Sequence, residues 1–164
     1  FRRVLFRSFI PITLLRDGPV GEGSVQLLIE ADFEQHYFTL HEQRPDLHPK
    51  LREMAVFDIL ANNTDRKSGH VLIDGDDNIW GIDHGLCFSS DFKLRTVIWE
   101  FGGEAIADSL LAAVERVAGS LPLDVSSLLN DEEVVALGER AAWLLEHRRL
   151  PVDQTGRRYP WPLV

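Results

Sequence analysis

The sequence predicts a protein of the α+β class, mostly helical and carrying two small β-hairpins. Three observations lead to this prediction. Two short apolar runs, Val71 to Asp74 and Ile79 to Asp83, flank the turn-forming residues Gly75-Asp76-Asp77-Asn78, which is typical of a hairpin. Nearer the N-terminus, a second pair of apolar runs brackets a glycine-rich turn. Longer segments repeat apolar residues every three or four positions, which is typical of amphipathic helices.

The first elements in chain order are two strands, Ile12 to Leu15 and Ser24 to Ile29, joined by the turn Asp17 to Gly23. That turn contains the pattern G-x-x-G-x-G, which also occurs in phosphate-binding loops. It is not followed by Lys-Ser/Thr or by a helical pattern, so the spacing favours a hairpin turn.

Three helices are expected from the apolar periodicity: Pro45 to Ala61, Glu104 to Gly119 and Asp131 to Arg148. Asn62 and Asn63 suit the end of the first helix, and Asn130 with the acids after it suits the start of the third. Asp58, on the first helix, either braces the loop that follows or lies on a solvated face. Trp99 and Trp143 are expected in the core, and Pro151 to Val164 is expected to be extended.

Composition limits the possible functions. The chain has 164 residues, of which 45% are hydrophobic and 26% charged, as expected for one globular domain. Its net charge of −9 opposes binding to nucleic acids and anionic membranes. No apolar run reaches the roughly 20 residues that span a bilayer, and no signal peptide is visible. We therefore expect a cytoplasmic protein with no nucleic-acid partner and no stable membrane association.

The single cysteine, Cys87, excludes an internal disulfide and fits a reducing compartment. The first eight residues, FRRVLFRS, match the translation of the end of a common sequencing adapter. We interpret Phe1 to Ser8 as an assembly artefact, with a short basic strand as the alternative. The chain does not start with Met, and we expect it to begin within a gene.

The segment Asn62 to Gly85 gathers side chains suited to phosphate and metal chemistry. If the turn centre lies between Asp76 and Asp77, His70 pairs with Asp83 across the hairpin. Asp65 and Arg66 precede the first strand and then lie at the same open end. We expect the carboxylates of Asp65 and Asp83 to lie about 4 to 8 Å apart, with His70 beside them. The alternative is a surface turn with acidic ends.

The order D-R-x-x-x-[N/H], a hairpin and then D-x-G resembles the catalytic loop and metal-binding segment of the phosphatidylinositol 3- and 4-kinase-like superfamily, which includes the HipA-type bacterial kinases. A longer part of the sequence is similar to one bacterial kinase-like family of that superfamily. This part runs from LRDGPVGEGSVQLLIE through MAVFDILANNTDRKSGHVL to PWPLV. The resemblance implies a protein-kinase-like large lobe over residues 31–164, mostly helical with a catalytic β-hairpin. Residues 9–30 would be the last strands of the small lobe and the start of the hinge.

The resemblance also implies roles for individual residues. Asp65 would align the acceptor hydroxyl, and Arg66 or Lys67 would offset phosphate charge. His70 and Asp83 would hold a divalent ion, Mg²⁺ or Mn²⁺. The superfamily usually has Asn at the position of His70, and an imidazole suits Mn²⁺ better than Mg²⁺.

Adenine recognition is expected at the hinge, where the backbone of Leu28, Ile29, Glu30 and Ala31 would bind ATP. In the superfamily, a glycine-rich lid and a phosphate-binding lysine precede the hinge. None of the three lysines, Lys50, Lys67 and Lys93, lies on a small-lobe strand. We therefore expect this fragment to be inactive alone.

Three functional hypotheses follow. The first is an ATP-dependent phosphotransferase that moves the γ-phosphoryl group to an unknown hydroxyl on a protein or small molecule. The second is a nucleotide-binding regulator without phosphotransfer, a pseudokinase, which His70 in place of Asn favours. The third is an interaction module that binds no nucleotide.

Overall fold

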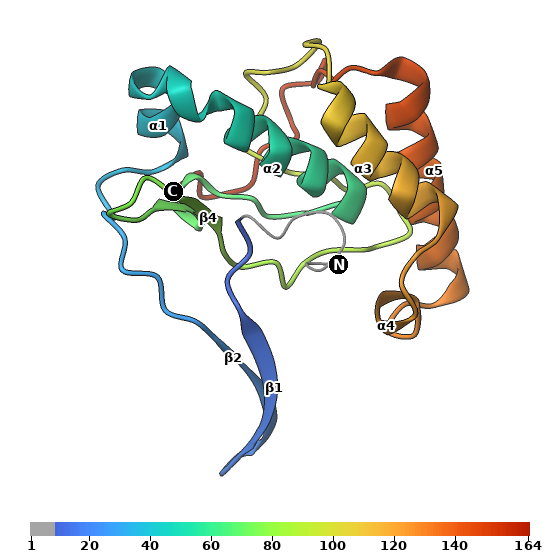
Figure 1. Ribbon diagram of the computed structural model, residues 1–164, viewed down its shortest axis with the longest axis horizontal. Coiled ribbons are helices and arrows are strands. Elements are labelled where there is room, and N and C mark those ends of the chain that lie inside the picture. The colour runs from blue at the N-terminus through green and yellow to red at the C-terminus, as the bar shows by residue number, and fades with distance from the viewer. Residues whose placement is uncertain (1–8) are drawn as a thin grey trace.

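Two antiparallel hairpins and a group of helices make up the protein, as the α+β prediction requires (Figure 1). The structure, a computed structural model, describes residues 9–164 apart from the side chain of Asp124. The interpretation of residues 1–8 as an artefact therefore concerns residues outside the described part. The α-helices are α1 (Tyr37–Gln43), α2 (His48–Ala61), α3 (Asp108–Gly119), α4 (Leu123–Ser126) and α5 (Asp131–His147). The strands are β1 (Thr13–Gly18), β2 (Gly21–Gln26), β3 (Val71–Ile73) and β4 (Ile79–Gly81).

The β1–β2 hairpin confirms the first predicted strand pair, but its turn is much tighter than expected. Its register pairs Gly18 with Gly21, so much of the glycine-rich segment belongs to the strands. Gly21 has a φ of 112°, which favours glycine. All residues of both strands are exposed, and the hairpin extends away from the rest of the molecule (Figure 1).

The β3–β4 hairpin forms where predicted, although its register differs by one residue. Val71 pairs with Gly81 and Ile73 with Ile79, so His70 lies opposite Ile82 and not opposite Asp83. The cause is a three-residue loop in which Asp77 takes a left-handed conformation, with φ of 61°. Asp74 fixes this loop, because its Oδ1 accepts hydrogen bonds from the backbone N–H of Asp76 and of Asn78.

Helix α2 is the centre of the core. Met54 to Ala61 are all buried, so this half of the helix is enclosed on every side, including the polar Asp58. The helix ends where predicted, because Asn62 adopts the left-handed conformation that terminates helices. It packs against α5 and β4, and a short 3₁₀ turn, η1 (Pro45–Leu47), precedes it.

Helices α3 and α5 lie side by side next to α2 (Figure 1). The predicted cap of α5 is confirmed, since Asn130 Oδ1 accepts from the backbone N–H of Glu133 while the Glu133 carboxylate accepts from that of Asn130. From α5, the buried Arg140 donates from Nε to the carbonyl oxygen of Leu60, 2.9 Å away. A cation thus satisfies a carbonyl at the C-terminal end of α2.

Several predictions needed correction. The helix predicted from Glu104 begins at Asp108, because Ala105 instead forms a β-bridge with Arg149. The sequence reading missed α1, which is short, and α4. Trp143 is not a core residue: it is 38% exposed and stacks on His147 of the next helical turn. Trp99 is half-buried against the core.

Three extended segments are joined by backbone hydrogen bonds. The loop after α2 contacts residues 94–97, because the N–H of Arg66 donates to the carbonyl of Arg95 and that of Val97 donates to the carbonyl of Arg66. The C-terminal segment is the third of these segments, because the N–H of Thr96 donates to the carbonyl of Arg158. As predicted, the described residues from Pro151 to Val164 contain no helix or strand.

Candidate functional site

The loop between α2 and β3 is held in place by a buried ion pair. Arg66 and Asp58 are both 0% exposed, and Arg66 Nη2 lies 3.0 Å from Asp58 Oδ1. Arg66 Nε donates to the same carboxylate, as do the side chains of Asn63 and Thr96. Such a pair is costly to bury unless it is well hydrogen-bonded, and here all three guanidinium nitrogens of Arg66 and both carboxylate oxygens of Asp58 have hydrogen-bond partners. Asp58 therefore braces the loop and does not lie on a solvated face.

This arrangement places Arg66 inside the protein. Its Nη1 donates to the carbonyl oxygen of Ile82 at 2.9 Å, which ties the loop to the segment just before Asp83. With no exposed surface, the guanidinium does not face a ligand. Arg66 therefore holds the loop in place, and Lys67, with 23% of its side chain exposed, is the cation of this loop that reaches the surface.

Asp65 and Lys67 lie on either side of Arg66 and point outward. Lys67 Nζ is 3.2 Å from Asp65 Oδ2, and the side chains are 23% and 27% exposed. The backbone N–H of Asp65 donates to Oδ1 of the buried Asn63, and this hydrogen bond holds the backbone of Asp65 in place. The site therefore presents a carboxylate with an ammonium group beside it.

His70 and Asp83 meet at the open end of the hairpin, as expected, despite the change in register. His70 Nε2 lies 3.5 Å from Asp83 Oδ2. Burial lowers the pKa of His70, against the raising effects of the Asp83 and Asp65 carboxylates. The imidazole is therefore neutral at pH 7, the form that can ligate a metal. The charges of Asp65 and Asp83 both act on the pKa of His70, and the expected distance of about 4 to 8 Å between the two carboxylates stays a prediction.

Asp83 has an unusual backbone conformation, with φ of 54°. A left-handed aspartate costs of order 1 kcal/mol, and residues of this kind concentrate at functional sites. Its side chain is 60% exposed and lines a cavity of about 480 Å³, within the range of small-molecule sites. Thr13, Ser24 and Gln26 of the β1–β2 hairpin also line this cavity.

His84 lines the same cavity but is not suited to act as a base. Burial lowers its pKa to about 3, and its ring packs edge-on against Phe57. Its buried Nε2 has no hydrogen-bond partner among the described residues. Burial also raises the pKa of Cys87 to about 12, so this thiol is unreactive at neutral pH.

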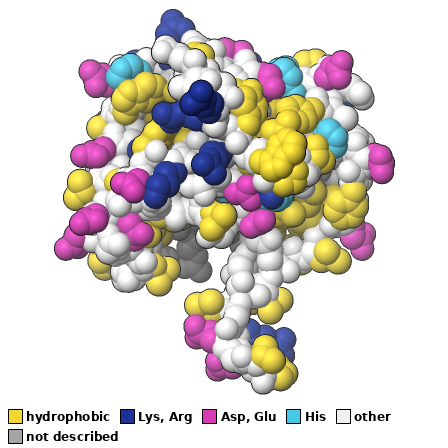
Figure 2. All heavy atoms as spheres, turned by 180° about the vertical axis from the view of Figure 1, so that it is seen from behind, with side chains coloured by type: hydrophobic (Ala, Val, Ile, Leu, Met, Phe, Trp, Pro, Cys, Tyr) yellow, Lys and Arg dark blue, Asp and Glu magenta, His cyan; other side chains and the backbone are white. Residues whose placement is uncertain are grey.

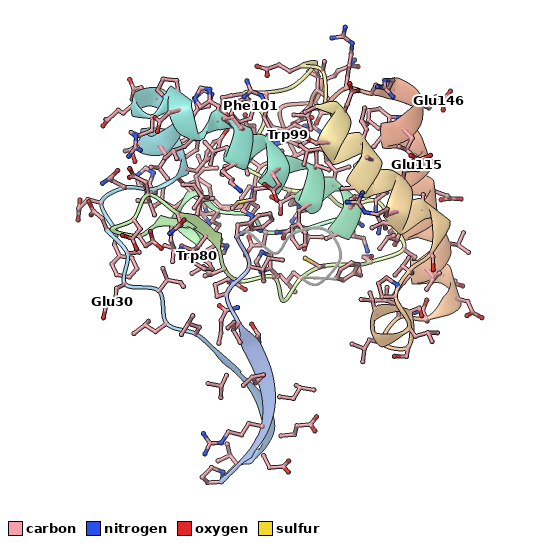
Figure 3. All side chains as sticks on the ribbon, viewed as in Figure 1. Glu30, Trp80, Trp99, Phe101, Glu115 and Glu146 are labelled. Carbon is pink, nitrogen blue, oxygen red and sulfur yellow. The ribbon has the colours of Figure 1, made fainter. Side chains whose placement is uncertain are left out.

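The expected hinge, Leu28 to Ala31, is an extended linker between β2 and the body of the protein. Ala31 forms a β-bridge with Asp74, and Ile29 is buried. Leu28 is 82% exposed, and Glu30 points away from the molecule (Figure 3). These residues are not among those that line the cavity beside Asp83, so the structure does not bring them to it.

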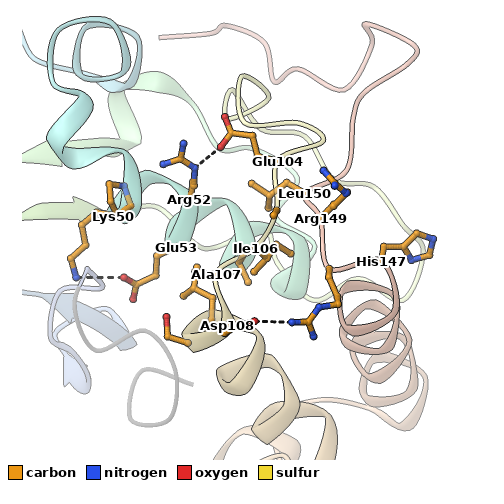
Figure 4. A pocket seen from close by; sticks show the side chains of 16 residues that line it. Lys50, Arg52, Glu53, Glu104, Ile106, Ala107, Asp108, His147, Arg149 and Leu150 are labelled. Atoms are coloured by element: carbon orange, nitrogen blue, oxygen red, sulfur yellow. Dashed lines mark hydrogen bonds and ion pairs between the residues drawn. The ribbon is translucent and has the colours of Figure 1, made fainter.

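A larger cavity, of about 1080 Å³, lies where α2, the segment before α3 and the end of α5 meet (Figure 4). Ion pairs between its lining residues join Arg52 to Glu104 and Arg148 to Asp108, each at 2.7 Å. None of the site residues predicted from the sequence lines it.

Metal binding at His70 and Asp83 would use one nitrogen and one carboxylate from the protein. No group of three or more His, Cys, Asp or Glu side chains that could hold a metal occurs in the described part of the chain. A pair of this kind would leave the other coordination positions of the ion to nucleotide phosphates and water. In addition, no helix among residues 9–164 is long and apolar enough to cross a membrane.

Sequence reasoning missed the parts of the site that depend on distant segments. Asn63 and Thr96 both donate to Asp58, and three residues of β1 and β2 line the same cavity as Asp83. The buried position of Asp58 could have been inferred from its place among apolar residues in the second half of α2. No local pattern indicated the contact with Thr96.

No protein-family model matches the chain. It is similar to protein Rv2133c of Mycobacterium tuberculosis, with 34% identity over 191 aligned residues. The similarity covers 94% of this chain and 69% of that protein.

Proposed function

We propose that this chain, which belongs to the same family as protein Rv2133c of Mycobacterium tuberculosis, is part of an ATP-dependent phosphotransferase with a protein-kinase-like large lobe. The observation that supports the proposal is a chain of contacts at the open end of the β3–β4 hairpin. Asp65 pairs with Lys67 at 3.2 Å, the backbone N–H of Lys67 donates to Nδ1 of His70 at 3.5 Å, and His70 lies 3.5 Å from Asp83. Phosphoryl transfer needs positioning and charge stabilisation more than covalent chemistry by the protein, and this site offers both.

In the proposed reaction, Asp65 accepts a hydrogen bond from the acceptor hydroxyl and takes its proton. The hydroxyl oxygen then forms a bond to the γ-phosphorus of ATP while the bond from that phosphorus to the bridging oxygen breaks, which releases ADP. Lys67 offsets negative charge on the transferred group. Arg66 and Asp58 keep the loop rigid. A divalent ion held by His70 and Asp83 would neutralise the phosphates.

The carboxylate of Asp65 is the group whose loss separates catalysis from binding. In the protein expressed from the complete gene, Asp65→Asn should lower kcat by about 10² to 10⁴ and leave nucleotide affinity nearly unchanged. Asp83→Asn should weaken metal-dependent ATP binding. Asp76→Asn is the matched control, since Asp76 lies exposed in the hairpin loop. Equal turnover by the Asp65→Asn variant and the control would refute a phosphotransferase that uses this residue.

The metal preference tests His70 separately. Turnover should be faster with Mn²⁺ than with Mg²⁺, and His70→Asn should reverse the order, because an amide oxygen is a harder ligand than an imidazole nitrogen. An unchanged order would place His70 outside the coordination sphere.

A nucleotide-binding regulator without phosphotransfer is the second candidate. The ion pair between Lys67 and Asp65 favours it, because the ammonium group competes for the carboxylate that should receive the acceptor hydroxyl. The two candidates differ in one measurement: a regulator binds ATP and metal but forms no ADP with any acceptor.

A further inference from the structure

A basic hollow lies on the outer side of the three extended segments. It has a volume of about 610 Å³, and its lining includes Lys93, Arg95, Arg157 and Arg158. The view from behind shows Lys and Arg side chains gathered on one face of a protein whose net charge is −9 (Figure 2). Four cations around one cavity are unexpected for such a chain, and local charge of this kind attracts anions.

Two of these guanidinium groups have no protein counterion. Arg95 and Arg157 form no ion pair with any residue in the described part of the chain, and both are exposed. Lys93 pairs with Asp91 at 3.1 Å, and the Arg158 guanidinium lies over the ring of Phe92. The guanidinium groups of Arg95 and Arg157 are therefore available to a ligand. A planar guanidinium can donate two parallel hydrogen bonds to one phosphate or carboxylate group.

The carboxylates nearby do not neutralise the hollow. Asp91 is committed to Lys93. Asp153 accepts hydrogen bonds from the backbone N–H groups of Thr155 and Arg158, and its charge acts on Arg158. Two carboxylates thus stand against four cations. A positive charge thus remains on the side of Arg95 and Arg157.

The hollow adjoins the candidate site through the backbone. Arg66 and Thr96 are bridged in parallel, and both side chains point inward to Asp58. Side chains alternate between the two faces of an extended segment, so Asp65 and Arg95, each one residue earlier, share the outer face. The N–H of Arg95 also donates to the carbonyl of Asn63, two residues before Asp65.

We infer that this basic hollow binds the anionic part of the acceptor substrate, a small molecule that carries a phosphate or carboxylate group as well as a hydroxyl. The assignment of the ligand as acceptor rests on the proposed function, whereas the anion site itself does not. The cavity has the volume of a small-molecule site, and Asp65 is not among the residues that line it. With its anionic group in the hollow, the ligand would extend past the Arg66–Thr96 bridge to bring its hydroxyl to Asp65.

Binding of glycerol 3-phosphate, measured by calorimetry on this chain without nucleotide, tests the site. Glycerol is the neutral comparison. Glycerol 3-phosphate should bind and glycerol should not, and the variant Arg95→Gln/Arg157→Gln should lose at least ten-fold in affinity. Arg116→Gln, an exposed arginine on α3, is the matched control and should bind as the parent does. Equal binding by the double variant and the control would overturn the inference.

Two further probes distinguish the sources of the anion. Vesicles of phosphatidylcholine with and without phosphatidylinositol test a lipid surface, and a single-stranded oligonucleotide tests nucleic acid. The proposal of a small-molecule ligand would be overturned if the protein bound the vesicles or the oligonucleotide through Arg95 and Arg157 but did not bind glycerol 3-phosphate. Loss of ATP turnover on Asp65→Asn with intact glycerol 3-phosphate binding would separate catalysis from the anion site. Anion binding without any ATP turnover would refute the proposed function but leave the site standing.

Discussion

At the scale of single residues, the buried pair of Asp58 and Arg66 decides the geometry of the candidate site. The carboxylate receives hydrogen bonds from Arg66, Asn63 and Thr96, and Arg66 also reaches the carbonyl of Ile82. The loop that presents Asp65 is thereby tied to the segment that presents Asp83. Rigid support of this kind keeps reacting groups within the narrow limits that catalysis requires.

Removing one partner of this pair should be severely destabilising. Asp58→Ala leaves the Arg66 charge buried and unpaired, so we expect the free energy of unfolding in urea to fall by about 3–5 kcal/mol. Lys50→Ala, which removes an exposed partner of Glu53, should change it by less than about 1 kcal/mol. A similar cost for both variants would contradict the bracing role of Asp58.

His84 should make stability depend on pH. Its pKa is about 3 in the folded protein and 6.5 in the unfolded chain, so below pH 6.5 the unfolded state binds more protons. Stability should therefore be fully present above pH 6.5 and fall as the pH drops toward 3. Denaturant titrations at several pH values should show a smaller loss for His84→Phe. An equal loss in the variant would show that other groups cause the pH dependence.

At the scale of elements, the β3–β4 hairpin depends on Asp74. Besides the loop N–H groups, its carboxylate accepts a hydrogen bond at 2.8 Å from the indole N–H of Trp80, which lies on β4 (Figure 3). Partial burial raises the pKa of Asp74, but the hydrogen bonds from Trp80, Asn78 and Asp76 outweigh it and lower the pKa to about 2. Asp74 thus enforces the three-residue loop and the register that follows from it.

Asp74→Ala should loosen this hairpin. We expect a loss of about 2 kcal/mol in unfolding free energy, because charge-assisted hydrogen bonds are lost. The fluorescence of Trp80 should also change as its indole N–H loses its partner. Asp76→Ala, in the same loop, keeps the Asp74 acceptor and should stay close to the parent protein. An Asp74→Ala variant as stable as the parent protein would contradict the stabilising role of Asp74 in this loop.

At the scale of the whole molecule, the C-terminal segment helps to hold the site. Ser68 N–H donates to the carbonyl of Leu163, Thr96 N–H donates to the carbonyl of Arg158, and Pro160 is buried. The tail, predicted only to be extended, therefore lies against both the loop after α2 and the segment that carries Arg95.

Removing residues 158–164 should expose these donors. In hydrogen exchange, the amides of Ser68 and Thr96 should lose protection, because their acceptors are gone. The amide of Arg66 is the internal control, since its acceptor is the carbonyl of Arg95. Unchanged protection of Ser68 and Thr96 would show that the tail does not stabilise the site.

The sequence alone determined the elements whose signals are local. Periodicity located α2 and α5, asparagines located the end of one and the start of the other, and turn residues located both hairpins. It also placed His70 near Asp83, because these residues flank one hairpin and remain close even when the register shifts by one.

Only the tertiary structure decided what depends on distant segments. Arg66 is buried, and not facing a ligand, because Asp58 and Ile82 supply its partners from elsewhere in the fold. Arg95 and Arg157 share a cavity because two extended segments pair through Thr96 and Arg158. Long-range backbone pairing of this kind leaves no periodic trace in the sequence, since any extended segment can supply the donors and acceptors.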